Sequence, residues 1–220
     1  MPTPAQLNDS SEAKPKLANT DLDRIIEFLF KNFVTNNPGL SNEDYQRERR
    51  NIEKNGRRLG AAVLRKEMSR ILNAEFETVR IYSMSKRYNN MSLWTKYAAD
   101  HKGYCLEFSN AGLFSAAREV TYRETADIDV TDPKQINEYF LFHKTNYWST
   151  EEEVRLVFPR GHMPTVNFDP KLLTRIILGR KMIEDDVRVI MDWAYKRPQK
   201  LPVVRAEYNE FEQKLNLIKV

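Results

Sequence analysis

Residues 79–109 read VRIYSMSKRYNNMSLWTKYAADHKGYCLEFS, and this stretch decides the organisation of the chain. Its first part, 79–85, alternates β-branched or aromatic residues with others, which is typical of a strand, until Tyr-Asn-Asn at 88–90 interrupts the pattern. Ser92 suits the start of a short helix, and a second apolar stretch follows at 104–109. The sequence therefore predicts a strand, a short helix and a second strand.

One face of that helix carries unusual chemistry. Met91, Trp94, Ala98 and His101 follow one another at spacings of three, four and three residues. Because an α-helix has 3.6 residues per turn, these spacings predict that the side chains point toward the same neighbour.

Composition limits the class of protein. The 220 residues are 41% hydrophobic, which is enough for a sizeable core. No apolar run reaches the roughly 20 residues of a membrane span, and the first residues lack the apolar segment of a signal peptide. We expect a cytoplasmic protein with no membrane partner.

The cysteine and histidine content points away from a metal centre. The single cysteine, Cys105, cannot form an internal disulfide, and its apolar surroundings favour a small core residue over a nucleophile. The three histidines show no metal-binding spacing, so we predict no zinc site.

Charge is unevenly distributed along the chain. The formal net charge is +4, but residues 47–70 carry a net charge of +6 and residues 119–153 a net charge of −6. Such a basic region could attract nucleic acid or another anion, although a charged helix face is more often only solvated.

The first third of the chain is predicted to be helical. Residues 1–19 contain three prolines and look like an irregular lead-in. Thr20 is the expected cap of an amphipathic helix. A charged helix should run from Ser41 to a stop at Asn55-Gly56, and a third should span 59–73.

The remaining residues predict strands with helices between them. The expected strands are 119–123, 148–158, 174–179, 203–208 and 214–220, and the expected helices are 136–144 and one beginning at Glu184. We therefore predict an α+β fold, with N-terminal helices followed by a mixed, mainly antiparallel sheet with interspersed helices. Residues 20–220 should form a single domain with a helical part, 20–73, and a sheet-containing part, 79–220.

Three blocks of sequence resemble a bacterial family known as domain of unknown function 2971. They are Ser83-Met84-Ser85 with Leu93-Trp94-Thr95-Lys96-Tyr97-Ala98 and His101-Lys102-Gly103-Tyr104-Cys105-Leu106-Glu107-Phe108; Lys144 with Trp148-Ser149-Thr150-Glu151-Glu152-Glu153-Val154-Arg155-Leu156; and Arg175-Ile176-Ile177-Leu178-Gly179. The resemblance implies a fold over roughly residues 7–180 and no established reaction.

The same resemblance gives an expectation about the N-terminus. Family members usually open with a Tyr-Lys-Tyr-like strand and a helix, followed by an Asn-Asp-Pro-Phe box. Residues 7–12, LNDSSE, resemble a degenerate form of that box and lie close to Met1. We therefore expect this chain to lack the usual first strand and helix.

The order of polar residues suggests one enzymatic hypothesis. Ser83-x-Ser85, an aromatic-rich helix and then Glu151-x-Glu153 is similar to the serine and glutamate elements of ADP-ribosyltransferases, for which NAD would be the co-substrate. Glu153 would stabilise the positive charge that develops at the ribose, with Glu151 beside it and Ser85 orienting the carboxylate or the ribose. The candidate residues for binding the nucleotide are Ser83, Arg87, Trp94, Tyr97, His101 and Arg155.

Two other interpretations stay open. Glu151 and Arg155 could form an ion pair beside a sheet, while Trp94, Tyr97 and His101 could be core residues at helical spacing. Alternatively, the protein is a non-catalytic binding module that contacts nucleic acid or an acidic partner through the basic helices at 47–70. Aromatic and amide side chains are scarce there, so such nucleic-acid binding should be non-specific.

Overall fold

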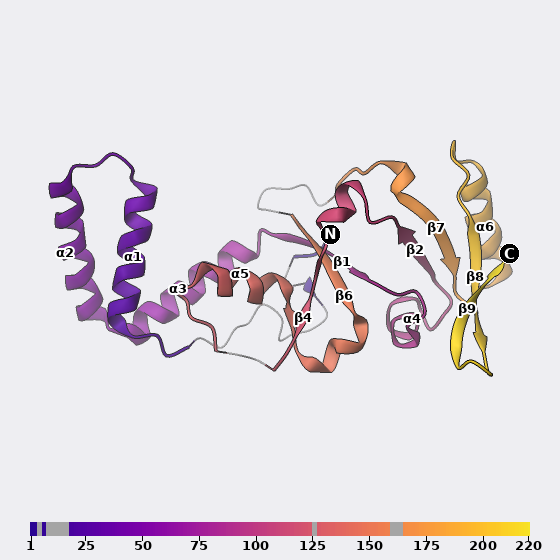
Figure 1. Ribbon diagram of the computed structural model, residues 1–220, viewed down its shortest axis with the longest axis horizontal. Coiled ribbons are helices and arrows are strands. Elements are labelled where there is room, and N and C mark those ends of the chain that lie inside the picture. Colours follow the sequence, from indigo (N-terminus) through magenta and orange to yellow (C-terminus); the bar gives the residue numbers. More distant parts are fainter. Residues whose placement is uncertain (4–5, 8–17, 125–126, 159–164) are drawn as a thin grey trace. The chain divides into compact units, whose positions relative to one another are not determined.

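The computed structural model describes residues 1–3, 6–7, 18–124, 127–158 and 165–220 (Figure 1). The expected box at 7–12, apart from Leu7, and His162 lie outside these residues. Helices come first and strands with interspersed helices follow, which confirms the α+β class. No described helix is long and apolar enough to cross a bilayer.

The chain divides into two compact units, each built from three separate segments of sequence. Unit 1 comprises Met1–Ile81, Thr121–Thr145 and Val157–His162, and unit 2 comprises Tyr82–Val120, Asn146–Leu156 and Met163–Val220. In both cases only the described residues are meant.

Unit 1 begins with helices α1 (Leu22–Asn36), α2 (Asn42–Leu59) and α3 (Ala61–Phe76). Helices α1 and α2 lie side by side as an antiparallel pair (Figure 1). The expected cap of α1 was wrong by one residue, because Asp21 accepts the hydrogen bond from the backbone N–H of Arg24. The Thr20 hydroxyl instead donates to Asp129, at 3.1 Å.

The predicted stop of α2 at Asn55-Gly56 was also wrong. The helix continues to Leu59, and Gly56 is buried against α1. A Cβ atom at Gly56 would lie 2.8 Å from Cγ1 of Ile26, so the glycine allows the two helices to approach closely. Gly60, with φ of 79°, separates α2 from α3.

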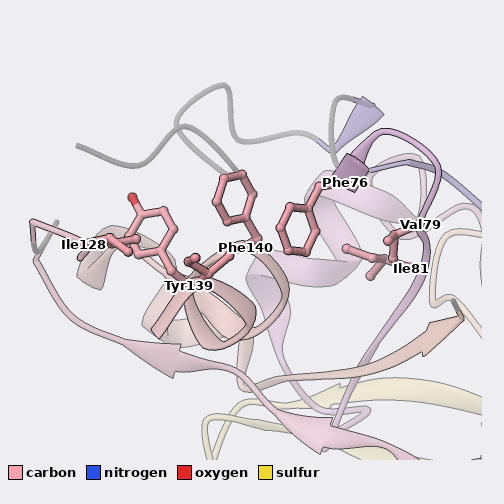
Figure 2. Packing of buried hydrophobic residues seen from close by; sticks show 7 residues of the cluster. Phe76, Val79, Ile81, Ile128, Tyr139 and Phe140 are labelled. Atoms are coloured by element: carbon pink, nitrogen blue, oxygen red, sulfur yellow. The ribbon is translucent and has the colours of Figure 1, made fainter. Parts of the chain in front are cut away.

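The core of unit 1 forms where α3 meets helix α5 (Pro133–Phe142), as Figure 2 shows. Phe76 and Phe140 stack with ring centroids 4.2 Å apart and nearly parallel planes. The residues packed around this pair are Val79, Ile81, Ile128, Ile136 and Tyr139. Helix α5 begins three residues before the predicted 136, because Asp132 caps it and Pro133 suits its first position.

The predicted strand at 119–123 is split in two. Strand β3 (Arg118–Glu119) pairs with β6 (Glu153–Phe158), whereas β4 (Thr121–Tyr122) pairs in parallel with β5 (His143–Lys144). The predicted helix over 136–144 therefore ends at Phe142, and its last two residues are strand.

Unit 2 contains a four-stranded sheet in the order β2-β7-β8-β9. Its strands are β2 (Tyr104–Phe108), β7 (Leu173–Leu178), β8 (Val203–Asn209) and β9 (Lys214–Lys219). The pairings β2–β7 and β8–β9 are antiparallel, and β7–β8 is parallel. The sheet is therefore mixed.

Alternate residues of β7 face two different helices. Ile176 and Leu178 pack with helix α6 (Glu184–Tyr195). Ile177 instead joins a cluster with Trp94 of helix α4 (Met91–Tyr97). Because side chains alternate along a strand, α4 and α6 cover opposite faces of the sheet.

The second sheet has the order β1-β6-β3, with β1 formed by Arg80–Ser85, and the boundary between the units passes through β1 and β6. The predicted strand at 148–158 begins too early. Residues Asn146–Glu151 form the 3₁₀ helix η3, and the strand starts at Glu153, after Glu152 turns the chain with φ of 45°. Two further 3₁₀ helices are η2 (Gly112–Ala116) and η4 (Pro170–Leu172).

Candidate functional sites

Three of the predicted site residues come together in unit 2. The Tyr97 hydroxyl donates to Oε1 of Glu151 at 3.0 Å, and the Ser85 hydroxyl donates to the backbone carbonyl of the same residue at 2.9 Å. The Glu151 side chain is buried, whereas Tyr97 is half exposed. Ser85, Tyr97 and Glu151 therefore form one polar cluster, named here the serine–glutamate cluster.

Local structure places this cluster. The end of β1 lies beside η3, because the backbone N–H of Lys86 donates to the carbonyl of Glu152. Since Glu151 is the last residue of η3, its side chain is directed by that helix rather than by the alternation of β6. Nζ of Lys96 lies 3.8 Å from Oε1 of Glu151 and 4.6 Å from the centroid of the Trp148 ring.

Glu153, the predicted catalytic carboxylate, is held in a buried ion pair. Nε of Arg155 donates to its Oε1 at 2.7 Å, and a second guanidinium nitrogen donates to Oε2 at 3.2 Å. Both side chains are almost completely buried, with 6% of Glu153 and 1% of Arg155 exposed. This bidentate contact gives Glu153 an evident role in packing β6.

Ser83 and Arg87 lie on the surface of unit 2. Ser83 is exposed in β1. The guanidinium of Arg87 pairs with the carboxylate of Glu152 at 2.9 Å, and both side chains are substantially open to solvent. Both side chains remain accessible to a ligand. Arg87 also contacts the serine–glutamate cluster through its backbone, since its N–H donates to the Ser85 hydroxyl at 3.3 Å.

Trp94 belongs to the core of unit 2. Its indole N–H donates to the carbonyl of Tyr88 at 2.5 Å, and its ring packs with Ile177, Ala206 and Leu215. Only 3% of the side chain is exposed, so its ring faces are unavailable for stacking on nicotinamide.

His101 is also buried, but outside the helix predicted to carry it. Helix α4 ends at Tyr97, and Ala99, Asp100 and His101 have positive φ values of 48°, 53° and 67°. The imidazole stacks on Trp94 with ring centroids 6.1 Å apart and planes 8° from parallel. Burial lowers the pKa of His101, and the nearby positive charge of Arg180 lowers this pKa further.

The predicted stripe of Met91, Trp94, Ala98 and His101 does share one neighbourhood, since Met91 and Ala98 pack with Trp94 and His101 stacks on it, but this stripe faces the core of unit 2. Asn90, rather than Ser92, caps α4. The helix directs Trp94 into the core and leaves the Tyr97 hydroxyl to reach Glu151.

In chemical terms, the serine–glutamate cluster offers a buried carboxylate that accepts a hydrogen bond from the Tyr97 phenol, while the Ser85 hydroxyl bonds the backbone carbonyl of the same glutamate. Such a group can accept hydrogen bonds from a sugar or stabilise a positive centre. Within the described part of the chain, no three His, Cys, Asp or Glu side chains are grouped so that they could hold a metal ion.

A second candidate site lies on α2 in unit 1. Its basic residues fall into two groups. Those engaged by acids are Arg47 with Asp44, Arg49 with Glu27, and Arg57 with Asp23. Arg50, Lys54 and Arg58 are exposed, and no ion pair with another described side chain involves them.

These three cations lie on one face. Their spacing of four residues aligns them along the helix, and about 12 Å separates the first from the last at 1.5 Å per residue. Gly56, on the opposite side of α2, packs against Ile26 of α1. Arg50, Lys54 and Arg58, named here the α2 basic face, therefore point away from α1. The sequence indicated a basic region, but only the ion pairs distinguish these residues from their neighbours.

Comparisons with known proteins place the chain in no family: no family model, no curated protein and no solved structure matches it. The resemblance to domain of unknown function 2971 stays a prediction, and function is argued from the residues.

Proposed function

We propose that the protein is a non-catalytic binding module that contacts the phosphate groups of nucleic acid through the α2 basic face. The observation that carries the proposal is the alignment of Arg50, Lys54 and Arg58 on one exposed face, where no acid of the described residues engages them. Lysine and arginine side chains supply most of the affinity for a nucleic-acid backbone, because phosphate contacts release bound counterions.

The composition of this face supports non-specific binding. Sequence readout needs side chains that reach base edges, and the neighbouring Asn51 amide is engaged by Glu48, at 3.2 Å. Aromatic side chains that could stack on bases are not among the three residues of the face. Contacts should therefore be made to phosphates and be tolerant of sequence.

Fluorescence anisotropy with a labelled duplex of about 20 base pairs tests the proposal. Over roughly 50 to 200 mM salt, three phosphate contacts predict a slope of about −2.7 for log K against log salt concentration. The variant with Arg50→Gln, Lys54→Gln and Arg58→Gln should lose most of this binding and most of its salt dependence.

A matched control removes three other exposed cations. Arg188→Gln, Lys196→Gln and Lys214→Gln change the net charge equally, and all three residues lie in unit 2. If both triple variants lose the same affinity, binding reflects net charge and the α2 basic face is not the site. Binding to polyglutamate but not to the duplex would overturn the proposal in favour of an acidic protein partner.

The serine–glutamate cluster supports a second candidate function, NAD cleavage of the ADP-ribosyltransferase type. Nicotinamide would leave with the electrons of its bond to ribose, and an acceptor oxygen would bond the ribose carbon and lose a proton. Because Glu153 is paired with Arg155, the carboxylate of Glu151 is the better candidate to stabilise the positive ribose.

Nicotinamide release from NAD tests this candidate. Glu151→Gln should lower release by roughly 10²-fold or more, because a neutral amide stabilises a cation poorly. Glu152→Gln is the matched control, since Glu152 is half exposed and pairs with Arg87. Absence of release by the folded wild-type protein would reject NAD cleavage, and equal effects of both substitutions would reject the role of Glu151.

A further inference from the structure

The loop between α4 and β2 holds His101 in an unusual way. Three consecutive residues without glycine, Ala99, Asp100 and His101, adopt the left-handed backbone region. Each such residue costs free energy, and strained backbone of this kind persists only where surrounding contacts impose it.

Those contacts come from the chain just after β7. The backbone N–H of Lys181 donates to the carbonyl of His101 at 3.0 Å, and that of Gly179 donates to the carbonyl of Gly103 at 2.9 Å. A Cβ atom at Gly179 would lie 2.1 Å from the carbonyl oxygen of His101. The glycine therefore lets the two backbones touch, and the contact fixes the position of the imidazole.

His101 is buried with an unused polar atom. Only 2% of the residue is exposed, and Nδ1 has no hydrogen-bond partner among the described residues. One face of the ring lies against Trp94. Leaving a buried polar atom without a partner is costly, so it calls for an explanation.

Arg180 presents a second unused donor nearby. Its Nε is buried and likewise makes no hydrogen bond within the described chain. The guanidinium lies over the ring of Tyr208, with its central carbon 6.0 Å from the ring centroid. Tyr208 lies two residues after Ala206 in β8, and residues at this spacing share a face of a strand. Because Ala206 packs with Trp94, Tyr208 lies on the same face of the sheet as Trp94.

The charges around these two groups favour an anion. Arg180 and Lys181 are positive, and their fields act on His101. The nearby carboxylate of Asp100 is engaged by Nζ of Lys181 at 2.7 Å. Arg180 has no acidic partner in the parts of the chain described, so its positive charge remains available to an anionic ligand.

We propose that His101 and Arg180 form a binding site for an oxyanion, the phosphate or carboxylate group of a small molecule. The anion would accept hydrogen bonds from Nε of Arg180 and from Nδ1 of His101, while Trp94 and Tyr208 hold the two planar groups in place. This site lies within unit 2 and is independent of the α2 basic face in unit 1.

Anion binding at this site should depend on pH. Protonated His101 donates from both nitrogens and attracts an anion, whereas the neutral ring is the form that burial favours. The charged groups acting on the ring are Asp100 on its own loop and Arg180 and Lys181 after β7. Binding should therefore strengthen as the pH falls below the usual histidine pKa of about 6.5.

Nitrogen-detected NMR of the histidine side chains provides the test, with sulfate as a non-titrating probe for phosphate and acetate as a probe for carboxylate. His101→Gln identifies the resonances of His101 among the three histidines. Saturable shifts of the His101 signals are expected, with higher affinity at pH 5.5 than at pH 7.5. Saturable shifts with sulfate alone would identify phosphate as the preferred group, and saturable shifts with acetate alone would identify carboxylate.

Substitutions at Arg180 distinguish recognition of the anion by a positioned hydrogen-bond donor from attraction by positive charge alone. Arg180→Gln should weaken binding by roughly tenfold or more, the usual worth of a charged hydrogen bond. Arg180→Lys keeps the charge but lacks Nε, and it should weaken binding nearly as much. Arg188→Gln, on the exposed side of α6, is the matched control and should leave the affinity unchanged.

Three results would overturn the proposal: no saturable shift at His101 with either anion, equal binding by wild type and Arg180→Lys, or equal weakening by Arg188→Gln. The ¹⁵N–¹H spectrum of each variant verifies that unit 2 stays folded. If Arg180→Gln fails to fold, Arg180→Lys alone decides between geometric recognition and simple attraction.

Discussion

Oε1 of Glu153 lies 2.7 Å from Nε of Arg155, two positions along β6, and both side chains are withdrawn from solvent. Residues i and i+2 of a strand share a face, so β6 buries an acid and a base side by side. A buried pair of this kind adds little net stability as a whole, but loss of one partner is costly.

We expect Arg155→Met to lower the free energy of unfolding by about 3–5 kcal/mol, because it leaves the buried Glu153 carboxylate without its bidentate donor. The double variant Glu153→Gln/Arg155→Met should lose less than the sum of the two single variants. Urea unfolding of the four proteins measures this coupling. Strict additivity would mean that the pair is not energetically linked.

Gly179→Ala should destabilise unit 2 strongly. The added Cβ would lie 2.1 Å from the carbonyl oxygen of His101 and 2.7 Å from that of Gly103, both of them backbone atoms that cannot rotate away. We expect a loss of about 3 kcal/mol or more, above the usual cost of overpacking. Thermal unfolding provides the measurement.

The control for Gly179 is Gly39→Ala, where φ is +94° but no atom of the described residues lies within 4 Å of the added Cβ. This substitution should lower the free energy of unfolding only by the cost of a left-handed backbone conformation, about 1–2 kcal/mol. Equal losses in the two variants would show that the contact with His101 is not tight.

Asp129→Asn should destabilise unit 1 at neutral pH by about 1–2 kcal/mol. The Asp129 carboxylate accepts from the Thr131 hydroxyl and the Thr20 hydroxyl and pairs with Arg24, at 2.7 Å. Burial raises the pKa of Asp129, but the hydrogen bonds from Thr131 and Thr20 and the charge of Arg24 outweigh it, so the pKa is lowered overall.

The sign of the pH dependence follows from that lowered pKa. The stabilising contribution of Asp129 is complete above the unfolded-state pKa of about 3.9 and is lost as the pH falls through the lower folded-state value. The difference in stability between wild type and Asp129→Asn should therefore shrink below about pH 4. Asp185→Asn, at an exposed i,i+3 pair on α6, should show no comparable difference.

Cys105 should react slowly with thiol reagents in the folded protein. Burial raises the pKa of its thiol, and the charge of Glu107 raises this pKa further. Because the thiolate is the nucleophile, labelling at pH 8 should be roughly tenfold or more slower in the folded than in the urea-unfolded chain. Equal rates would show that β2 is open to solvent at this position.

Local patterns in the sequence predict the elements whose periodicity is long or regular. Helix α6 begins at Glu184 as its acidic first turn indicates, and β7 covers the apolar run within one residue of the predicted start. In both α6 and β7, the buried residues follow the apolar pattern of the sequence. The packing of these elements therefore agrees with their local sequence preference.

Other features depend on contacts that no local pattern contains. Gly56 resembles a helix stop, but its lack of a side chain serves the packing of Ile26 instead. Glu152 resembles a strand residue, but its left-handed conformation separates Glu151 from Glu153 and gives the two carboxylates different surroundings. The candidate site could therefore be predicted as a set of residues but not as a geometry.

The interleaved segments of the two units have a consequence for synthesis on the ribosome. Unit 1 draws on residues as late as 158, whereas unit 2 draws on both 82–120 and the C-terminal strands β8 and β9. Neither unit corresponds to a continuous fragment of the gene, so neither can be transplanted or expressed by cutting the chain at one position. The nascent chain must keep β2 from misassociating until β7, β8 and β9 emerge to complete its sheet, and β1 must likewise wait for β6.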